Sequence, residues 1–282
     1  MERTIVALHA HPDDEASKGA ATVARYADAG ARAVLVCATG GEAGDVLNPA
    51  MDRPEVRERL PEVRRAELHA AAAIIGYHEV IELGYRDSGM PGSTANGDPE
   101  AFCNVPFTDP LRDVVAIIRR ERPRVLFGYD EHRFYPHPDH LRIRDLGIAA
   151  FTAAADPARF PECGDAWEVA KLYAPVFTRR RIETLHQAME RRGLESPFER
   201  WLERRDDMDL EYDGIISSIE VGATLARGRR ALREHRTQVD PNGFWFQVPL
   251  AVVREEYPYE DFELLASRVP VTGPETDLFA GI

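Results

Sequence analysis

Histidine and aspartate residues gather at two places in this chain, and at both places they flank a proline. The first is residues 10–15, with the sequence Ala-His-Pro-Asp-Asp-Glu, and the second is residues 137–140, with the sequence His-Pro-Asp-His. Neutral imidazole and carboxylate groups are ligands of divalent metals, and a spare carboxylate can act as a base toward water. The two motifs together predict one hydrolytic metal site.

The motifs contain enough groups for metal ligation and for acid–base catalysis. The simplest division assigns three metal ligands, which are His11, Asp14 and His140. Three protein ligands leave an open coordination position for water. Asp13 would then take the proton of the water, and His137 would either polarise the carbonyl oxygen or protonate the leaving amine. Asp139 would orient a histidine through a hydrogen bond.

These assignments have alternatives at the level of single residues. Aspartate is a preferred N-cap residue, so Asp13 or Asp139 could simply cap a helix. The ligand set suits Zn²⁺, and Fe²⁺ would accept the same groups. The remaining histidines stand apart from the motifs and are expected to be structural or on the surface, with His132 a weaker candidate: His9, His69, His78, His132, His186 and His235.

The elements around the two motifs predict that the motifs meet. The first motif closes a continuous apolar run at residues 4–10, which is typical of a strand buried on both faces, and the second follows a strand expected at residues 124–129. Helices are expected at residues 14–29 and from 138 to about 155. Because open α/β sheets bind ligands at the carboxyl ends of their strands, we expect both motifs at that edge.

Strands and helices alternate through the first half of the chain. Further strands are expected at residues 31–39 and 79–83, and helices at residues 57–75 and 110–121. This alternation predicts an α/β protein with a Rossmann-like layered fold and a mostly parallel sheet. No G-x-G-x-x-G motif follows the first strand, so a dinucleotide is not indicated.

The second half is less regular. It offers strands at residues 169–177 and 215–221, a helix at 180–192 and a helix ending at 235. We therefore expect a Rossmann-like metal-binding core at residues 1–160 and a smaller C-terminal α+β subdomain, residues 161–282, packed on it.

The composition limits the possible partners and compartment. A net charge of −13 over 282 residues argues against nucleic acid and against an anionic membrane surface. No segment approaches the roughly 20 apolar residues of a membrane span, and no signal peptide is recognisable. Three dispersed cysteines, Cys37, Cys103 and Cys163, predict reduced thiols. We expect a cytoplasmic protein whose oligomeric state the sequence leaves open.

The motifs resemble those of the LmbE-like (PIG-L) zinc de-N-acetylases, which are Rossmann-like metalloenzymes that hydrolyse amides on glucosamine-containing substrates. Within that family the resemblance extends to the actinobacterial branch that hydrolyses mycothiol S-conjugates. It includes further segments from the whole chain, namely residues 15–20, 39–42, 47–51, 87–90 and 275–281.

The resemblance implies a zinc amidase that cleaves the amide between an S-conjugated cysteine and the glucosamine of a small-molecule thiol conjugate. Lys18 favours this activity over the deacetylation of an N-acetylglucosaminyl-inositol, because the amidase branch resembles this chain in having lysine there. Only two of the 35 basic residues are lysine, which suggests a compact cation chosen for the pocket. The alternative is an ordinary lysine on a solvent-facing helix.

The resemblance also implies a set of substrate-binding residues, which comprises Lys18, Arg64, Asp87 and Tyr135. Arg64 and Asp87 would hold the sugar and inositol hydroxyls. Arg64 could instead pair with Glu67, three residues on, along an exposed helix face.

The chain departs from the family pattern just before His137. Family members have an Asn-Gly-Gly segment there, whereas residues 131–135 of this chain are Glu-His-Arg-Phe-Tyr. Losing two glycines removes backbone freedom and adds bulk, so the substrate is expected to differ while the reaction is kept. A specialised paralogue in a natural-product pathway would fit. The alternative from another class is a non-catalytic conjugate-binding protein, against which the presence of both Asp13 and His137 argues.

Overall fold

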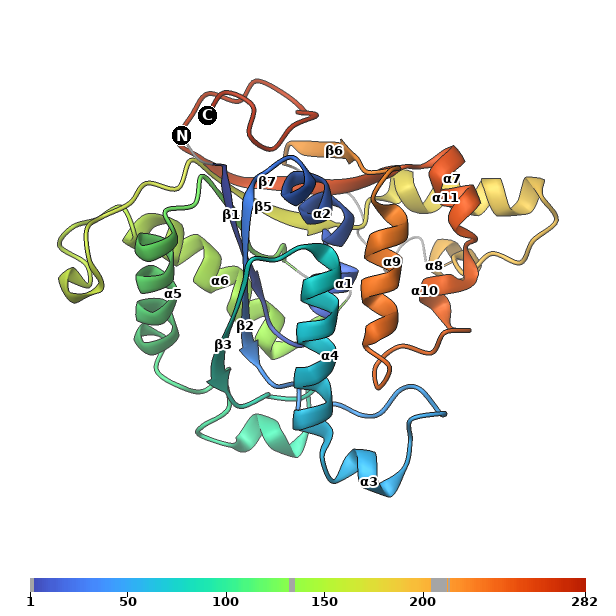
Figure 1. Cartoon of the computed structure of the whole chain (residues 1–282), viewed down its shortest axis with the longest axis horizontal. Coiled ribbons are helices and arrows are strands. Elements are labelled where there is room, and N and C mark those ends of the chain that lie inside the picture. The colour runs from blue at the N-terminus through green and yellow to red at the C-terminus, as the bar shows by residue number, and fades with distance from the viewer. Residues whose placement is uncertain (1–2, 132–134, 204–211, 213) are drawn as a thin grey trace.

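The computed structural model describes residues 3–131, 135–203, 212 and 214–282. Within these residues seven strands form one sheet in the order β3-β2-β1-β4-β5-β7-β6 (Figure 1). The strands are β1 (Thr4–His9), β2 (Arg32–Thr39), β3 (Glu79–Tyr85), β4 (Val125–Phe127), β5 (Lys171–Val176), β6 (Ile216–Glu220) and β7 (Tyr259–Ser267). Strands β1 to β5 pair in parallel, and β7 runs antiparallel to both β5 and β6.

Strand β1 lies between β2 and β4 and is buried along its whole length. Its side chains alternate between the faces of the sheet, so Ile5 and Ala7 enter one hydrophobic core while Val6 and Leu8 enter the other. This two-sided burial explains the unbroken apolar run. The predicted α/β class and mostly parallel sheet are confirmed.

Helices cover both faces of the sheet (Figure 1). Helices α5 (Thr108–Glu121) and α6 (Pro138–Ala153) pack on one face. The other face carries α2 (Ala20–Asp28), α4 (Leu60–Ile75), α7 (Arg179–Arg191), α9 (Leu225–Glu234) and α11 (Leu250–Glu256). Shorter helical segments are α1 (Asp14–Ser17), α3 (Pro54–Arg57), α8 (Glu199–Glu203), α10 (Phe244–Gln247), η1 (Thr94–Gly97) and η2 (Pro161–Cys163).

The single helix expected at residues 14–29 is wrong, because the chain breaks into α1 and α2 at Gly19. Gly19 has a left-handed backbone with φ +83°, which favours glycine. The first free N–H groups of α2, at Ala21 and Thr22, donate to the carboxylate of Glu260 from β7. A tertiary contact thus caps α2. The short α1 contains Asp14 and Glu15, the last two residues of the first motif. The expected helix at residues 57–75 likewise begins later, as α4, after the separate turn α3.

Residues 161–282 contribute β5, β6 and β7 to the same sheet, together with the helices from α7 to α11. The strands expected at 169–177 and 215–221 are confirmed as β5 and β6, whereas β7 and α11 have no counterpart in the sequence-based expectation. The division into core and subdomain stays a prediction. None of the helices in the described ranges is both long and apolar enough to cross a membrane.

Candidate metal centre

The two motifs meet at the carboxyl end of the central strands. The first follows β1, and the second leads into α6, whose N-cap is His137. His137 Nδ1 accepts a hydrogen bond from the backbone N–H of Asp139 at 3.2 Å. Asp139 therefore lies inside the first turn and does not cap the helix. In a neutral His137 this contact leaves the imidazole proton on Nε2.

Three donor atoms converge at this place, and they belong to the three predicted metal ligands. Asp14 Oδ2 lies 3.6 Å from His11 Nδ1 and 3.3 Å from His140 Nε2, and the two ring nitrogens are 3.3 Å apart. Zinc bonds of about 2.1 Å arranged tetrahedrally would put ligand atoms about 3.4 Å apart. All three side chains are buried. The donor set therefore fits a divalent metal such as zinc.

The orientation of the His11 ring follows from its second nitrogen. His11 Nε2 lies 3.1 Å from Asp139 Oδ2 and 3.4 Å from Asp87 Oδ1. A proton on Nε2 satisfies these carboxylates and leaves the lone pair of Nδ1 directed at Asp14 and His140. Asp139 is itself held by Ser88, which donates from its backbone N–H at 3.0 Å and from its hydroxyl.

A second group of potential ligands consists of His11, Asp87, His137 and Asp139. It shares His11 with the first group. Both oxygens of Asp139 accept hydrogen bonds from Ser88, and His137 Nδ1 accepts from the backbone N–H of Asp139. These hydrogen bonds fix Asp139 and His137 next to the three atoms of the first group.

Asp13 occupies an unusual backbone conformation next to this group. Its φ of 119° and ψ of −26° lie in the left-handed region, and its carboxylate makes no cap hydrogen bond to α1. The carboxylate lies 3.3 Å from the guanidinium of Arg64, and 27% of the side chain is exposed. The capping alternative for Asp13 is thus not what the structure shows; the carboxylate remains accessible beside the ligands.

Arg64 is buried on the inner side of α4 rather than on an exposed helix face. Its guanidinium donates to the carbonyl oxygens of Gly41 at 2.5 Å and Pro12 at 2.6 Å, in addition to its contact with Asp13. Gly41 has φ +66°, and a Cβ there would lie 2.2 Å from the guanidinium. Glycine is therefore required at this position for Arg64 to reach the motif.

The other two residues expected to bind substrate lie on either side of the ligands. The ammonium of Lys18 contacts Asp14 Oδ1, the carboxylate oxygen that faces away from the histidines, and lies over the ring of Tyr129. Tyr135 is exposed, with its ring 5.1 Å from that of His140 and 6.0 Å from that of His137. Residues 132–134, which include the weaker candidate His132, lie outside the described residues.

Burial and charge set the protonation of the metal-free site. Burial lowers the pKa of His140 to about 3, so this imidazole is neutral. Burial also lowers the pKa of His137, as does the neighbouring His11. For His11 burial is opposed by hydrogen bonds to carboxylates, which raise its pKa well above the ordinary value. Burial alone would raise the pKa of Asp87, but contact with His11 holds it well below the usual range. In the metal-free site the His11 ring is therefore the histidine that favours the doubly protonated form.

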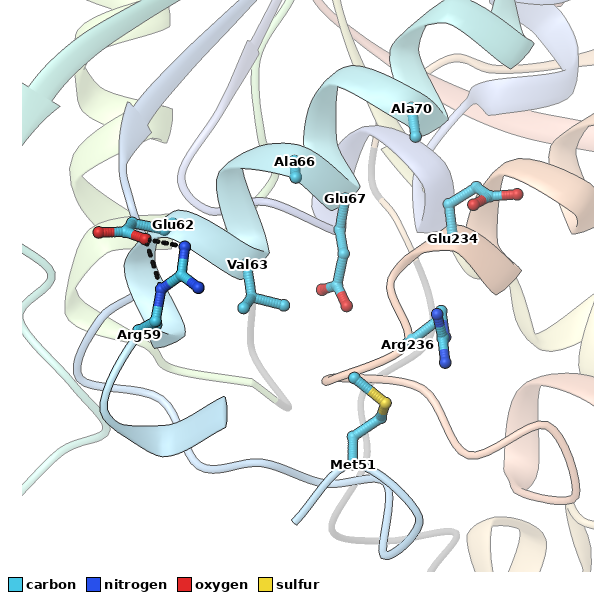
Figure 2. Close-up of a pocket in the computed structure, with 9 residues that line it drawn as sticks. All are labelled: Met51, Arg59, Glu62, Val63, Ala66, Glu67, Ala70, Glu234 and Arg236. Atoms are coloured by element: carbon cyan, nitrogen blue, oxygen red, sulfur yellow. Dashed lines mark hydrogen bonds and ion pairs between the residues drawn. The ribbon is translucent and has the colours of Figure 1, made fainter. Parts of the chain in front are cut away.

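A pocket of about 380 Å³ lies elsewhere, between α4 and the chain that follows α9 (Figure 2). Its lining residues are Met51, Arg59, Glu62, Val63, Ala66, Glu67, Ala70, Glu234 and Arg236. None of them is a predicted site residue. The chemistry is thus concentrated at the buried His/Asp group and not in this pocket.

Comparison with known proteins places the chain in a family. Residues 6–151 match the model of the PIG-L family, described as GlcNAc-PI de-N-acetylase. The mycothiol S-conjugate amidase of Streptomyces coelicolor is 40% identical, over 99% of this chain and 97% of that protein. The chain belongs to the PIG-L family.

The PIG-L relatives include more than one activity. The 1D-myo-inositol 2-acetamido-2-deoxy-alpha-D-glucopyranoside deacetylase of Geodermatophilus obscurus is 37% identical, over 99% of this chain and 98% of that protein. Among solved structures, the N,N'-diacetylchitobiose deacetylase from Pyrococcus horikoshii has a TM-score of 0.63 at 18% identity, covering 93% of this chain and 84% of that one. This likeness supports the fold.

The comparisons bear on several of the expectations. The LmbE-like (PIG-L) resemblance and the assignment to a family of amide hydrolases are confirmed. The relatives carry names of small-molecule amidases and deacetylases, and the buried His/Asp group could hold a metal.

Sequence reasoning missed two residues of this PIG-L site. Glu15, which is fully buried, contacts the Nε2 of His235 through Oε1 at 2.5 Å, and His235 is fully buried too. The position of Glu15 directly after the two aspartates was a signal that could have been followed. His235 follows 220 residues later, after a helix of ordinary amphipathic pattern, and nothing near it points to the motif.

Proposed function

We propose that this protein is a metal-dependent amidase that cleaves the amide between an S-substituted cysteine and the glucosamine of a mycothiol S-conjugate. The observation that carries the proposal is the convergence of His11, Asp14 and His140 beside an accessible Asp13. Similarity over nearly the full length to a named amidase of this type supports it. The unpaired cysteines suit a reducing compartment such as the cytoplasm.

We assign the metal to His11, Asp14 and His140, and expect Zn²⁺, with Fe²⁺ as the other ion that suits these ligands. A divalent metal bound there supplies Lewis-acid chemistry, because it polarises a carbonyl oxygen and makes water a stronger acid. Asp139 orients His11 through its contact at 3.1 Å. Lys18 neutralises the oxygen of Asp14 that faces away from the histidines.

The proton transfers fall to Asp13 and His137. Water adds to the amide carbonyl carbon as the Asp13 carboxylate accepts its proton. His137 carries its proton on Nε2, because Nδ1 accepts from Asp139 N–H, and so it can donate to the carbonyl oxygen or to the leaving nitrogen. When the C–N bond breaks, the nitrogen leaves as the amine of glucosamine and the carbonyl carbon as the carboxylate of the S-substituted N-acetylcysteine.

We propose that Tyr135 contacts the substrate directly, since its exposed ring is stacked on that of His137 and meets that of His140 edge-on. Lys18, Arg64 and Asp87 complete the substrate-binding wall in this proposal. Each of them also holds a catalytic group, namely Asp14, Asp13 and His11. Changing any of these three is therefore expected to lower kcat as well as to raise KM.

Deacetylation of N-acetylglucosaminyl-inositol is the second candidate, because relatives named for that activity match over the same length. Lys18 favours the amidase. The test measures kcat/KM of the purified, zinc-loaded protein with a mycothiol S-conjugate and with N-acetylglucosaminyl-inositol. We expect at least a tenfold preference for the conjugate, about 1.4 kcal/mol in transition-state binding. A preference for the acetylated substrate would contradict the amidase proposal.

A further inference from the structure

Directly behind Asp13, two ionisable residues from opposite ends of the chain form a buried pair. Glu15 belongs to α1, and His235 is the C-cap of α9. Both side chains have no exposed surface, and His235 Nε2 lies 2.5 Å from Glu15 Oε1. Within the described structure His235 Nδ1 has no hydrogen-bond partner. The only polar contact found for this imidazole is therefore with Glu15.

Glu15 connects His235 to Asp13, because each of its two carboxylate oxygens contacts one of them. Its second oxygen, Oε2, accepts a hydrogen bond from the backbone N–H of Asp13 at 3.0 Å. That N–H belongs to the residue whose φ is 119°, a conformation that costs on the order of 1–3 kcal/mol for a residue other than glycine. Such a backbone persists only when its surroundings hold it. The Glu15 carboxylate supplies that hold, and His235 fixes the carboxylate.

The same C-terminal segment reaches Asp13 by a second route. Thr237 donates to the carboxylate of Glu67 on α4, from its N–H at 3.0 Å and from its hydroxyl at 2.6 Å. Figure 2 shows Glu67 projecting from α4 near Glu234 and Arg236, the residues on either side of His235. Arg64 lies three residues before Glu67 and holds the Asp13 carboxylate. His235 therefore reaches the backbone of Asp13 through Glu15, and Thr237 is fastened to α4, the helix that carries Arg64.

We propose that Glu15 and His235 are positioning residues that hold Asp13 in its catalytic orientation. The proposal rests on the assignment of Asp13 as the base. In the described part of the chain the hydrogen bonds of these two side chains go to each other and to the backbone of Asp13, so their effect on metal binding should be small. A buried ionisable pair contributes little net stability compared with apolar residues of similar size. The position of the pair next to the strained backbone of Asp13 indicates a positioning role and not a stabilising one.

The first test compares two substitutions of His235. His235→Leu removes the hydrogen bond to Glu15, whereas His235→Gln can place an amide N–H near the position of Nε2. We expect His235→Leu to lower kcat by about 10- to 100-fold, with KM and bound zinc unchanged. His235→Gln should recover most of that loss. Because His235→Leu leaves a carboxylate buried without its partner, kcat is measured well below the unfolding temperature of each variant.

Lys171→Met is the matched control, since it also removes one member of a buried ion pair but at the far end of β5. It should lose stability without losing kcat. If His235→Leu matches the control, with kcat within twofold of the wild type in the fully folded protein, the positioning role is wrong and the pair is merely structural.

A double-mutant cycle with Asp13→Asn separates this proposal from the proposed function. If His235 acts through Asp13, adding His235→Leu to Asp13→Asn lowers kcat by no more than a further twofold. Independent, multiplicative losses would overturn the positioning role while leaving Asp13 as the base. If Asp13→Asn alone keeps full activity, it is the proposed function that fails.

A measurement that needs no substrate completes the test. The Asp13 amide hydrogen is bonded to Glu15, so its exchange with solvent deuterium reports on the brace. We expect faster exchange of this amide in His235→Leu and wild-type exchange in the Lys171→Met control under conditions where both are folded. Unchanged exchange in His235→Leu would contradict the brace even if the wild-type protein cleaved neither amide.

Discussion

The chain has only two lysines, and the structure places them at opposite ends of the sheet, each against a carboxylate. Lys171 begins β5, level with the start of β1, and is fully buried. Lys18 lies at the carboxyl end, where its ammonium contacts Asp14. Both pairs consist of a lysine ammonium and a carboxylate. They differ in how completely the protein satisfies the groups around them.

At the Lys171 end the charged groups are paired within the protein. The ammonium donates to both oxygens of Glu275 and to the carbonyl of Ala280, each at 2.7 Å, which uses all three of its N–H groups. The hydroxyl of Tyr173 also donates to Glu275. This arrangement fastens the C-terminal residues to β5. It needs nothing from outside the chain.

At the Lys18 end the protein alone leaves the arrangement incomplete. The ring nitrogens of His11 and His140 lie 3.3 Å apart, and Asp14 Oδ2 lies 3.6 Å from the first and 3.3 Å from the second, so three potential ligand atoms form a triangle that one cation could bridge. Asp13 beside them is held in a left-handed backbone. A bound cation would be coordinated by the three converging atoms. The strained backbone of Asp13 is expected for a residue that takes part in catalysis. The comparison teaches that an ion pair closed within the protein belongs to the fold, whereas converging ligand atoms mark the candidate site.

The largest expected effect comes from removing a ligand at the incomplete end. His140→Ala deletes one of the three converging donor atoms, so we expect zinc to be lost on dialysis and turnover to fall by more than about 10⁴-fold. Metal analysis of the dialysed protein and the rate of amide cleavage check this. Stoichiometric, tightly held zinc in the variant would show that the metal binds elsewhere, with the second His/Asp group as the first place to look.

Lys18→Met, at the same end, should have a smaller effect. Removing the ammonium frees Asp14 Oδ1 and loosens the ligand without deleting it, so we expect kcat/KM for the conjugate to fall about 10- to 100-fold. Zinc affinity should weaken by a similar factor. Steady-state kinetics and a zinc competition titration measure the two effects. An unchanged kcat/KM would show that Lys18 has no role at the site.

The pH dependence of metal binding should be weaker still, at most tenfold per pH unit. Hydrogen bonds to carboxylates outweigh burial and raise the pKa of His11, so this ring holds a second proton in the metal-free protein, and zinc must displace the proton on Nδ1. Zinc affinity should therefore fall as the pH is lowered. Titrations with zinc at several pH values check the sign. Affinity that rises as the pH falls would contradict it.

The same contrast explains what the sequence could predict. The central strands can be recognised as apolar runs because they are buried on both faces of the sheet. The two motifs, which follow β1 and β4, indicate metal chemistry by their residue types alone. The break at Gly19 and the brace from His235 could not be found in this way. The first depends on Glu260 reaching α2 from β7, and the second joins residues 220 positions apart. Local sequence records neither contact.

The Lys171 end also explains why β7 and the tail escaped prediction. Strand β7 is antiparallel to its neighbours and only partly buried, so it lacks the apolar signature of β1. The contact between Lys171 and Glu275 joins residues 104 positions apart. A lysine within an otherwise apolar strand was the one visible clue, because a lysine is rarely fully buried without a partner.

Lys171→Met should have the smallest effect on turnover and so gives the sharpest test of the comparison. It leaves Glu275 without its cation, and breaking a buried pair in this way costs about 3–5 kcal/mol in the free energy of unfolding. We expect urea unfolding to show that loss while kcat per folded molecule and zinc content stay at wild-type values. A drop in kcat in the folded variant would mean that the two ends of the sheet are coupled. Since the ammonium of Lys171 bonds to Glu275 and Ala280 at the end of β5 remote from the metal centre, we expect stability and turnover to separate.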